Sequence, residues 1–148
     1  AVRYSIVRVA PDKPVKFRWE EALSFEGRSA PFLQYSYARA TSLLRKAERL
    51  SGPYPFRATE LGTPEEEALV QVLSRLPERV GYAARSGHVH AVATYAHELA
   101  DAFHRCYQAV PVLRAGPERE SRLSLVAATR IALGNTLDLL GLARPERM

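Results

Sequence analysis

The sequence predicts an all-α fold, a bundle of helices joined by short connections, and three observations lead to this prediction. Apolar residues recur at alternating steps of three and four along two long segments, which is the period of an amphipathic helix. Helix start and stop signals bracket these segments. The 148 residues contain no convincing strand pattern, internal repeat or low-complexity tract. Such a pattern predicts helices packed on helices around one core.

Residues 1–18 are expected to form a lead-in segment, and residues 19–148 the helical domain. The first nine residues are ambiguous, because their β-branched side chains favour a strand while so short an apolar run also fits the end of a helix. Pro11 and Pro14 indicate a loop up to residue 16. A short helix is expected over residues 19–25, closed by Gly27.

The segment 30–47 predicts a long helix with two different faces. Ser29 is a suitable N-cap, and Pro31 is tolerated in the first turn. One face is an apolar stripe expected in the core, formed by Leu33, Tyr37, Ala40, Leu44 and Ala47. The opposite face carries an aromatic ring among cations, and it consists of Tyr35, Arg39, Ser42, Lys46 and Arg49. Phe32 lies between the two faces. This arrangement indicates a helix that packs against a core and holds a polyanion.

Thr63, Pro64 and Glu66 form a strong helix start, because they supply a cap, a proline at the first helical position and the carboxylate of a capping box. The helix that they begin is expected to stop at Pro77. A weaker helix follows over residues 78–85.

Two longer helices complete the bundle. The first is expected over residues 89–110, with a regular apolar stripe of Val92, Ala96, Leu99, Phe103, Cys106 and Val110. The second is expected over about residues 118–140, and Gly141 follows it as a C-cap.

The charge balance favours an acidic partner such as nucleic acid, since the formal net charge is +5 and the pI about 9.7.

The single cysteine excludes an internal disulfide framework and fits a reducing cytoplasm. No apolar run reaches the roughly 20 residues that span a bilayer. The chain begins at Ala1, and its one methionine is Met148, which we interpret as an excised C-terminal domain or one trimmed for study.

Three polar residues of the segment 89–110 raise the alternative of a metal site. His97, Asp101 and His104 are spaced at i, i+4 and i+7, a spacing that zinc ligands can use. No fourth ligand is evident, so a solvated helix face is the preferred interpretation and no metal is expected. Cys106 belongs to the apolar stripe and is expected to be inert core. No residue pattern indicates catalysis.

Three blocks of the sequence match a known family in the right order. They are FEGRSAPFLQYSYARATSLLRKA from Phe25, YAHELADAFHRCYQAVPVL from Tyr95, and RLSLVAATRIALGNTLDLLGLARPERM at the end. Together they resemble the C-terminal anticodon-binding domain, of the DALR type, of class I arginyl-tRNA synthetases. The resemblance covers essentially the whole chain and implies an all-α anticodon-binding bundle.

The resemblance also implies a binding partner for this chain and a separate catalytic domain in the family. The partner is an arginine tRNA, bound by its anticodon loop, and the middle anticodon base, a cytosine, is read most stringently. ATP and arginine bind the family's catalytic domain, whose HIGH-like motif is missing here, so this chain is expected to use no cofactor and to catalyse nothing alone. The lead-in segment is expected to contact that domain, and the chain to be monomeric. The alternative is a free-standing helical module derived from the domain, binding another RNA or a protein.

Site residues are assigned from the family and from the charge pattern. The family's anticodon contacts match Phe32, where tyrosine is more usual, Tyr35 and Tyr107, while Met148 closes the bundle near the anticodon. A fourth aromatic position of the family is Pro111 here, so no stacking is implied there. The cations of the helix are expected along the RNA backbone, and they are Arg39, Arg45, Lys46 and Arg49.

Overall fold

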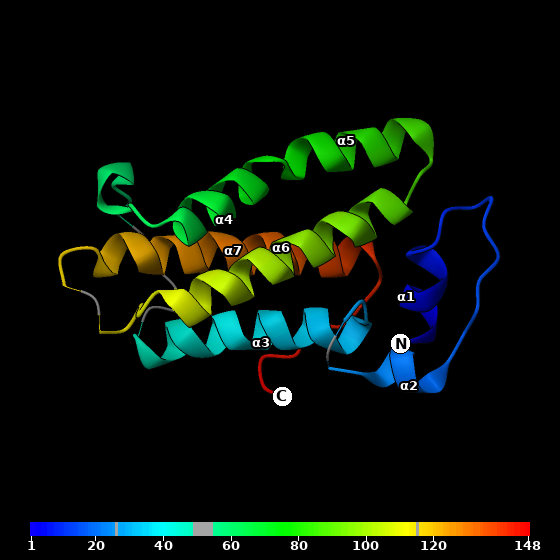
Figure 1. Cartoon of the computed structure of the whole chain (residues 1–148), viewed down its shortest axis with the longest axis horizontal. Helices are drawn as coiled ribbons and strands as arrows, with labels where there is room; N and C mark the ends of the chain where they lie inside the picture. Colours follow the sequence, from blue (N-terminus) through cyan, green and yellow to red (C-terminus); the bar gives the residue numbers. More distant parts are fainter. Residues whose placement is uncertain (26, 49–54, 115) are drawn as a thin grey trace.

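The computed structural model describes residues 1–25, 27–48, 55–114 and 116–148, which form a helical bundle (Figure 1). Three long helices, α3 (Ala30–Lys46), α6 (His90–Ala109) and α7 (Arg119–Leu139), lie side by side at its centre. No strand occurs within the described ranges, so the predicted all-α fold is confirmed. Glu26 of the first block, Arg49 of the cationic face, the connector up to residue 54 and Ala115 lie outside the described residues.

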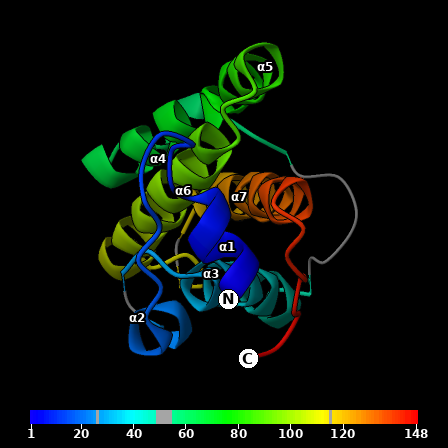
Figure 2. The same cartoon turned by 90° about the vertical axis from the view of Figure 1, so that its right-hand side faces the viewer.

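Shorter helices cover the central three. A 3-10 turn, Ala58–Glu60, leads into α4 (Pro64–Ser74), and both α4 and α5 (Leu76–Ser86) pack along α6. α1 (Val2–Val7) and α2 (Trp19–Leu23) lie at one end of the bundle, and Figure 2 views this end directly. The ambiguous first residues are therefore helical.

α1 is tied to the bundle at two points. Its Tyr4 side chain is buried, with 2% of its surface exposed. Arg3 donates a hydrogen bond from Nη1 to the carbonyl oxygen of Gly141, at 2.9 Å. Gly141 has a left-handed backbone with φ of +64°, which favours glycine, and a Cβ there would also displace the Arg3 guanidinium.

The predicted caps form as expected, because they depend on neighbours in the sequence. Ser29 Oγ accepts a hydrogen bond from the backbone N–H of Phe32 at the start of α3. Thr63 and Glu66 form the complete capping box of α4. The predicted role of Pro77 is wrong: α4 already ends at Ser74, and Pro77 lies in the first turn of α5, where its missing N–H costs nothing.

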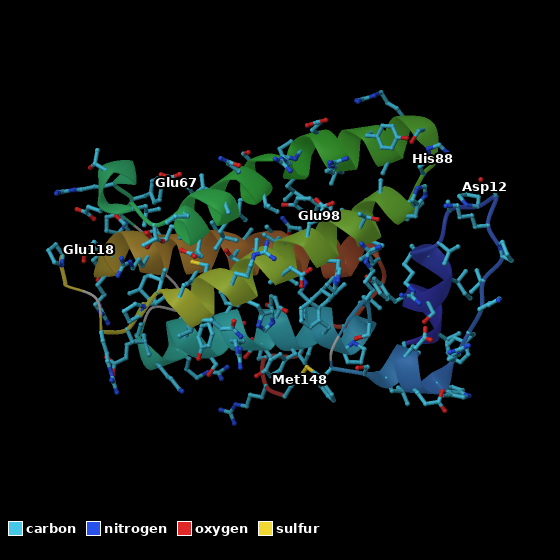
Figure 3. All side chains as sticks on the ribbon, viewed as in Figure 1. Asp12, Glu67, His88, Glu98, Glu118 and Met148 are labelled. Carbon is cyan, nitrogen blue, oxygen red and sulfur yellow. The ribbon has the colours of Figure 1, made fainter. Side chains whose placement is uncertain are left out.

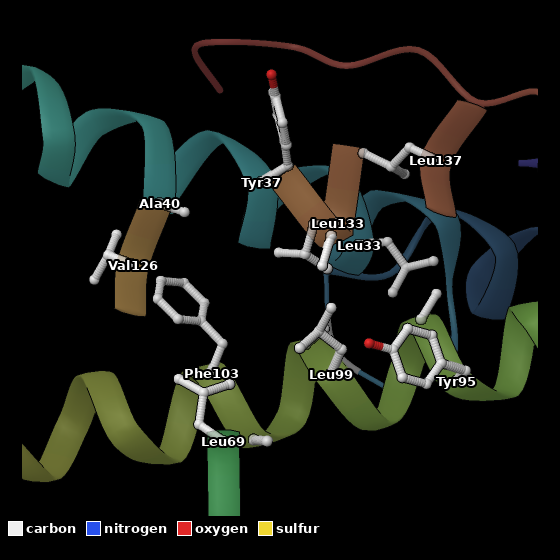
Figure 4. Packing of buried hydrophobic residues seen from close by; sticks show 14 of the residues in the cluster. Leu33, Tyr37, Ala40, Leu69, Tyr95, Leu99, Phe103, Val126, Leu133 and Leu137 are labelled. Atoms are coloured by element: carbon white, nitrogen blue, oxygen red, sulfur yellow. The ribbon is translucent and has the colours of Figure 1, made fainter. Parts of the chain in front are cut away.

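The core is formed where α3, α6 and α7 meet, with Leu69 reaching in from α4 (Figure 4). All six residues of the predicted α6 stripe are buried. The predicted α3 stripe is buried too, except for Ala47, which is partly exposed. α3 also buries Ser36, Ala38, Thr41 and Leu43, because it packs against both α6 and α7.

Cys106 is part of this core, as predicted. Burial raises the pKa of its thiol to about 11, so it stays neutral and unreactive at physiological pH.

Candidate nucleic-acid interface

An arginine is stacked between two tyrosines where α3 meets the last turn of α6. The guanidinium carbon of Arg39 lies 4.6 Å from the ring centroid of Tyr35 and 4.5 Å from that of Tyr107. Arg39 also donates a hydrogen bond to the Tyr35 hydroxyl. The first contact follows from the i, i+4 spacing on α3, whereas the second joins α3 to the last turn of α6. The flat guanidinium is thereby held in one orientation.

This stack opens onto a groove of about 600 Å³ between α3 and the C-terminal residues. Five of the six residues predicted for the site line the groove, namely Tyr35, Arg39, Lys46, Tyr107 and Met148. Arg45, Glu146 and Arg147 line it as well. Among the residues that the structure describes, four cationic side chains and one glutamate line the groove, which gives it a positive balance suited to an anionic ligand.

The C-terminal residues reach the groove because they fold back beneath α3 (Figures 1 and 3). Gln34 donates a hydrogen bond from Nε2 to the carbonyl oxygen of Ala143, at 3.0 Å. Arg45, predicted to follow the RNA backbone, instead lies 3.2 Å from the carboxylate of Glu146. These two contacts bring Met148 against α3, and neither could be predicted from local sequence.

Gly134 makes room for this return. A Cβ at this position would lie 3.2 Å from both the Arg144 guanidinium and the Tyr37 ring. Arg144 also pairs with Asp138, which lies in the last turn of α7. The absence of a side chain at Gly134 thus allows the tail to pass close to the helix.

Phe32 lies behind the groove instead of lining it. Its ring stacks on His104 with centroids 5.0 Å apart and meets His97 edge-on at 5.2 Å. His104 also contacts Tyr35, whose ring is nearly parallel to the imidazole, with centroids 5.9 Å apart. Phe32 therefore packs against His104, and His104 in turn packs against Tyr35. The position of Phe32 between the two faces of α3 did not predict this role.

The predicted solvated face of α6 is wrong for His97 and His104. His97 is buried with 9% of its surface exposed, and half-buried His104 faces α3. His104 Nε2 lies 2.9 Å from Ser36 Oγ, and its Nδ1 lies 3.4 Å from Arg39 Nη1. Their polar character predicted exposure, but α6 is covered by several other helices, so these polar residues are buried. A buried polar residue needs a hydrogen-bond partner.

The hydrogen bonds of His104 define its protonation. Arginine can only donate, so Nδ1 accepts and Nε2 carries the proton that it gives to Ser36. The Ser36 hydroxyl in turn donates to the carbonyl oxygen of Phe32, at 2.8 Å. Neutral His104 therefore connects Arg39 to the backbone of α3. Among the residues that the structure describes, no group of three or more His, Cys, Asp or Glu side chains is placed to hold a metal ion.

We expect both histidines to make the fold sensitive to mild acid. Burial lowers the pKa of His97 against the opposing effect of Asp101, and burial together with Arg39 lowers the pKa of His104. A histidine with a lowered pKa in the folded state binds its proton more readily when unfolded, so the free energy of unfolding falls as pH drops below about 6.5. Urea titrations between pH 7.5 and 5.5 measure this slope, and His104→Gln is expected to reduce it. A pH-independent midpoint would contradict the assignment.

Comparison with known proteins identifies the type of domain. The family model for the DALR anticodon binding domain matches residues 33–148. The chain belongs to the DALR anticodon-binding domain family. The family expected from the sequence of this DALR domain is therefore confirmed. The matched range includes every residue assigned to the site except Phe32.

Similar proteins agree with the family match. The chain is 47% identical to the arginine–tRNA ligase of Methanocella arvoryzae and 46% identical to that of Pyrococcus abyssi, over its full length in both cases. The arginyl-tRNA synthetase structure from Thermus thermophilus matches 99% of the chain with a TM-score of 0.90 and 41% identity. The chain spans about a quarter of the length of these proteins: 26% of the Methanocella protein, 24% of the Pyrococcus protein and 26% of the Thermus chain. Within the described residues, no helix is both long and apolar enough to cross a bilayer.

Proposed function

We propose that this DALR domain binds the anticodon loop of an arginine tRNA in the groove between α3 and the C-terminal residues. The observation that carries the proposal is the Tyr35–Arg39–Tyr107 stack, which lines a cationic groove in a domain of an anticodon-binding family. The bases of an anticodon loop are unpaired and can be turned outward, so they can stack on rings and be read at their edges.

The groove supplies each of the contacts that such a loop needs. The tyrosine rings offer stacking faces, and each base–aromatic stack contributes about 1–3 kcal/mol to binding. Arg39 has donors in a fixed plane, suited to the acceptor groups of a base edge or a phosphate. Lys46 and Arg147 are exposed at the rim, where they neutralise backbone phosphates and make the affinity salt-dependent.

Two alanine variants test this division between stacking and charge. Tyr35→Ala is expected to raise the Kd for an arginine tRNA by about tenfold and to reduce the discrimination between anticodons, because a stacking face that positions a base is lost. Lys46→Ala is expected to weaken binding equally for all tRNAs and to reduce the salt dependence, because a phosphate contact carries no sequence information. Fluorescence anisotropy with labelled tRNA measures both effects.

Lys16→Ala is the matched control for Lys46→Ala, because Lys16 is exposed but lies outside the groove. We expect Lys16→Ala to bind like the wild type. If Tyr35→Ala and Lys46→Ala also kept the wild-type Kd, the tRNA would have to bind elsewhere.

A second surface supports the expected contact with another domain. Residues 1–25 expose several large apolar side chains at the end of the bundle seen in Figure 2, namely Val2, Ile6, Val15, Phe17, Trp19, Leu23 and Phe25. Trp19, the largest of them, is 59% exposed and packs edge-on against Phe17. Several exposed large apolar side chains within one short segment are typical of an interface. Because the relatives are about four times longer, we assign this surface to contact with their catalytic domain, where ATP and arginine would bind.

A further inference from the structure

A second pocket, of about 350 Å³, lies near the first turns of α6, between that helix and the segment around α1. It is separate from the groove, and no lining residue is shared between the two. Its polar lining is almost entirely basic, with Arg8, Lys13, Arg28, His90 and His97. None of the aspartates and glutamates that the structure describes lines it. A concentration of cationic groups in one concavity costs repulsion energy unless an anion is bound there.

Three nitrogen atoms of this lining are buried without a hydrogen-bond partner: Arg8 Nε, His90 Nδ1 and His97 Nδ1. Burying a polar atom without a partner is unfavourable, and such atoms are rare in folded proteins. His97 is the most informative of the three, because the residue is only 9% exposed. Arg8 Nε can only donate, and the two histidine nitrogens donate when their rings are protonated, so together they fit a ligand that accepts hydrogen bonds.

The remaining contacts of Arg8 and His97 fix these side chains in place. Arg8 donates from Nη1 to the carbonyl oxygen of Arg28 at 2.9 Å, and its Nη2 lies 3.9 Å from Glu21. His97 Nε2 lies 3.6 Å from Asp101 Oδ2, which leaves Nδ1 as the free nitrogen. Burial lowers the pKa of His97, and the charges of Arg28 and Arg8 lower it further. The positive field of the pocket thus acts on the histidine, and a bound anion would relieve it.

We propose that this pocket binds a phosphate group. A phosphate carries close to two negative charges when free and one as an RNA diester, and in both forms its oxygens accept several hydrogen bonds at once. Arg8, Lys13 and Arg28 supply the charge, and a histidine protonated on binding donates from Nδ1. The source is either a phosphate of an RNA backbone or a free phosphate, and the same groups recognise both.

The position of the pocket suits an RNA that already occupies the groove. His97 and Tyr107 are ten residues apart on α6, which corresponds to about 15 Å along the helix. This distance equals about four phosphate spacings along one strand, at about 3.4 Å each. One RNA hairpin can therefore reach both sites. This RNA source rests on the proposed function, whereas the phosphate site itself does not.

The direct test is a titration of the chain with inorganic phosphate, followed by NMR of its four ¹⁵N-labelled histidine side chains. We expect saturable shifts at His90 and His97, and none at His88 or His104, which lie outside the pocket. Lys13 and Arg28 are both exposed, so the double variant Lys13→Gln/Arg28→Gln should fold and lose the response. Lys16→Gln, from the same loop but outside the lining, should keep it. Absence of saturable shifts, or shifts that persist in the double variant, would overturn the proposal.

Measurement of tRNA binding separates the two sources. If the phosphate belongs to RNA, the double variant should bind tRNA about tenfold more weakly, and the slope of log Kd against log salt should fall by about 1.5–2. If its tRNA affinity equals that of Lys16→Gln while wild-type His97 still responds to phosphate, the ligand is a free phosphate. The NMR titration contains no RNA, so failure of the phosphate site and failure of anticodon binding give different results.

Discussion

Replacement of Glu66 with alanine is expected to destabilise the fold by about 3–5 kcal/mol, the cost of leaving a buried charge without its partner. Glu66 is 0% exposed. Its Oε1 accepts a 2.7 Å hydrogen bond from Nε of Arg122 on α7, a side chain that is only 14% exposed. Its Oε2 accepts hydrogen bonds from the backbone N–H groups of Gly62 and Thr63. One carboxylate thus caps α4 and joins it to α7.

The pKa of Glu66 agrees with this role. Burial alone would raise the pKa, but hydrogen bonds from Thr63, Arg122 and Gly62 outweigh burial and hold it below 4.5. A carboxyl group with a lowered pKa in the folded state stabilises the protein above its unfolded pKa, and this contribution is lost as pH falls through the folded value. The destabilisation by Glu66→Ala should therefore be full at neutral pH and diminish in acid.

Urea unfolding followed by circular dichroism measures the difference. Glu67→Ala is the matched control, because Glu67 belongs to the same helical turn but is exposed, and a change within about 0.5 kcal/mol is expected there. Glu66→Gln keeps the shape of the side chain and removes its charge, so it should lie between the two. A loss below about 1 kcal/mol for Glu66→Ala would show that the ion pair with Arg122 contributes little.

The elements that the sequence predicts correctly are those whose causes are local. Ser29 and the Thr63–Glu66 box cap their helices through residues three positions apart, and the α6 stripe repeats with the helical period. The prediction for Pro77 is wrong because a proline can follow the end of one helix or lie in the first turn of the next, and the sequence alone does not distinguish the two. The hydrogen bond between Glu66 and Arg122 could not be predicted from the sequence, because the two residues are 56 positions apart.

The candidate site divides in the same way. The i, i+4 spacing of Tyr35 and Arg39 indicates their contact, whereas the approach of Tyr107 depends on how α6 packs on α3. The family resemblance supplied Tyr107 and Met148, which spacing alone does not connect with α3. His104 was missed because its partners, Ser36 and Arg39, lie more than 60 residues away in the sequence. A polar residue beside an apolar stripe gives no local sign that another helix covers it.

The middle base of the anticodon should control binding to the groove. We expect an arginine tRNA whose middle cytosine is replaced by another base to bind about ten- to a hundredfold more weakly, because one base-edge contact contributes about 1–3 kcal/mol of discrimination. Arg39 is held between two rings, so its N–H donors cannot readily turn to a base that fits poorly. A wrong base leaves these donors unpaired, and the loss of affinity is therefore larger than on a flexible surface. A change of the same kind in the acceptor stem should have no effect on the isolated chain.

The comparison of these Kd values tests the central claim most directly. Wild-type chain and Tyr35→Ala are each titrated with the arginine tRNA and with its middle-base variant, at one fixed salt concentration. The account predicts a gap of at least tenfold between the two tRNAs for the wild type and a clearly smaller gap for Tyr35→Ala. Equal affinity of the wild-type chain for both tRNAs would contradict anticodon recognition by this groove.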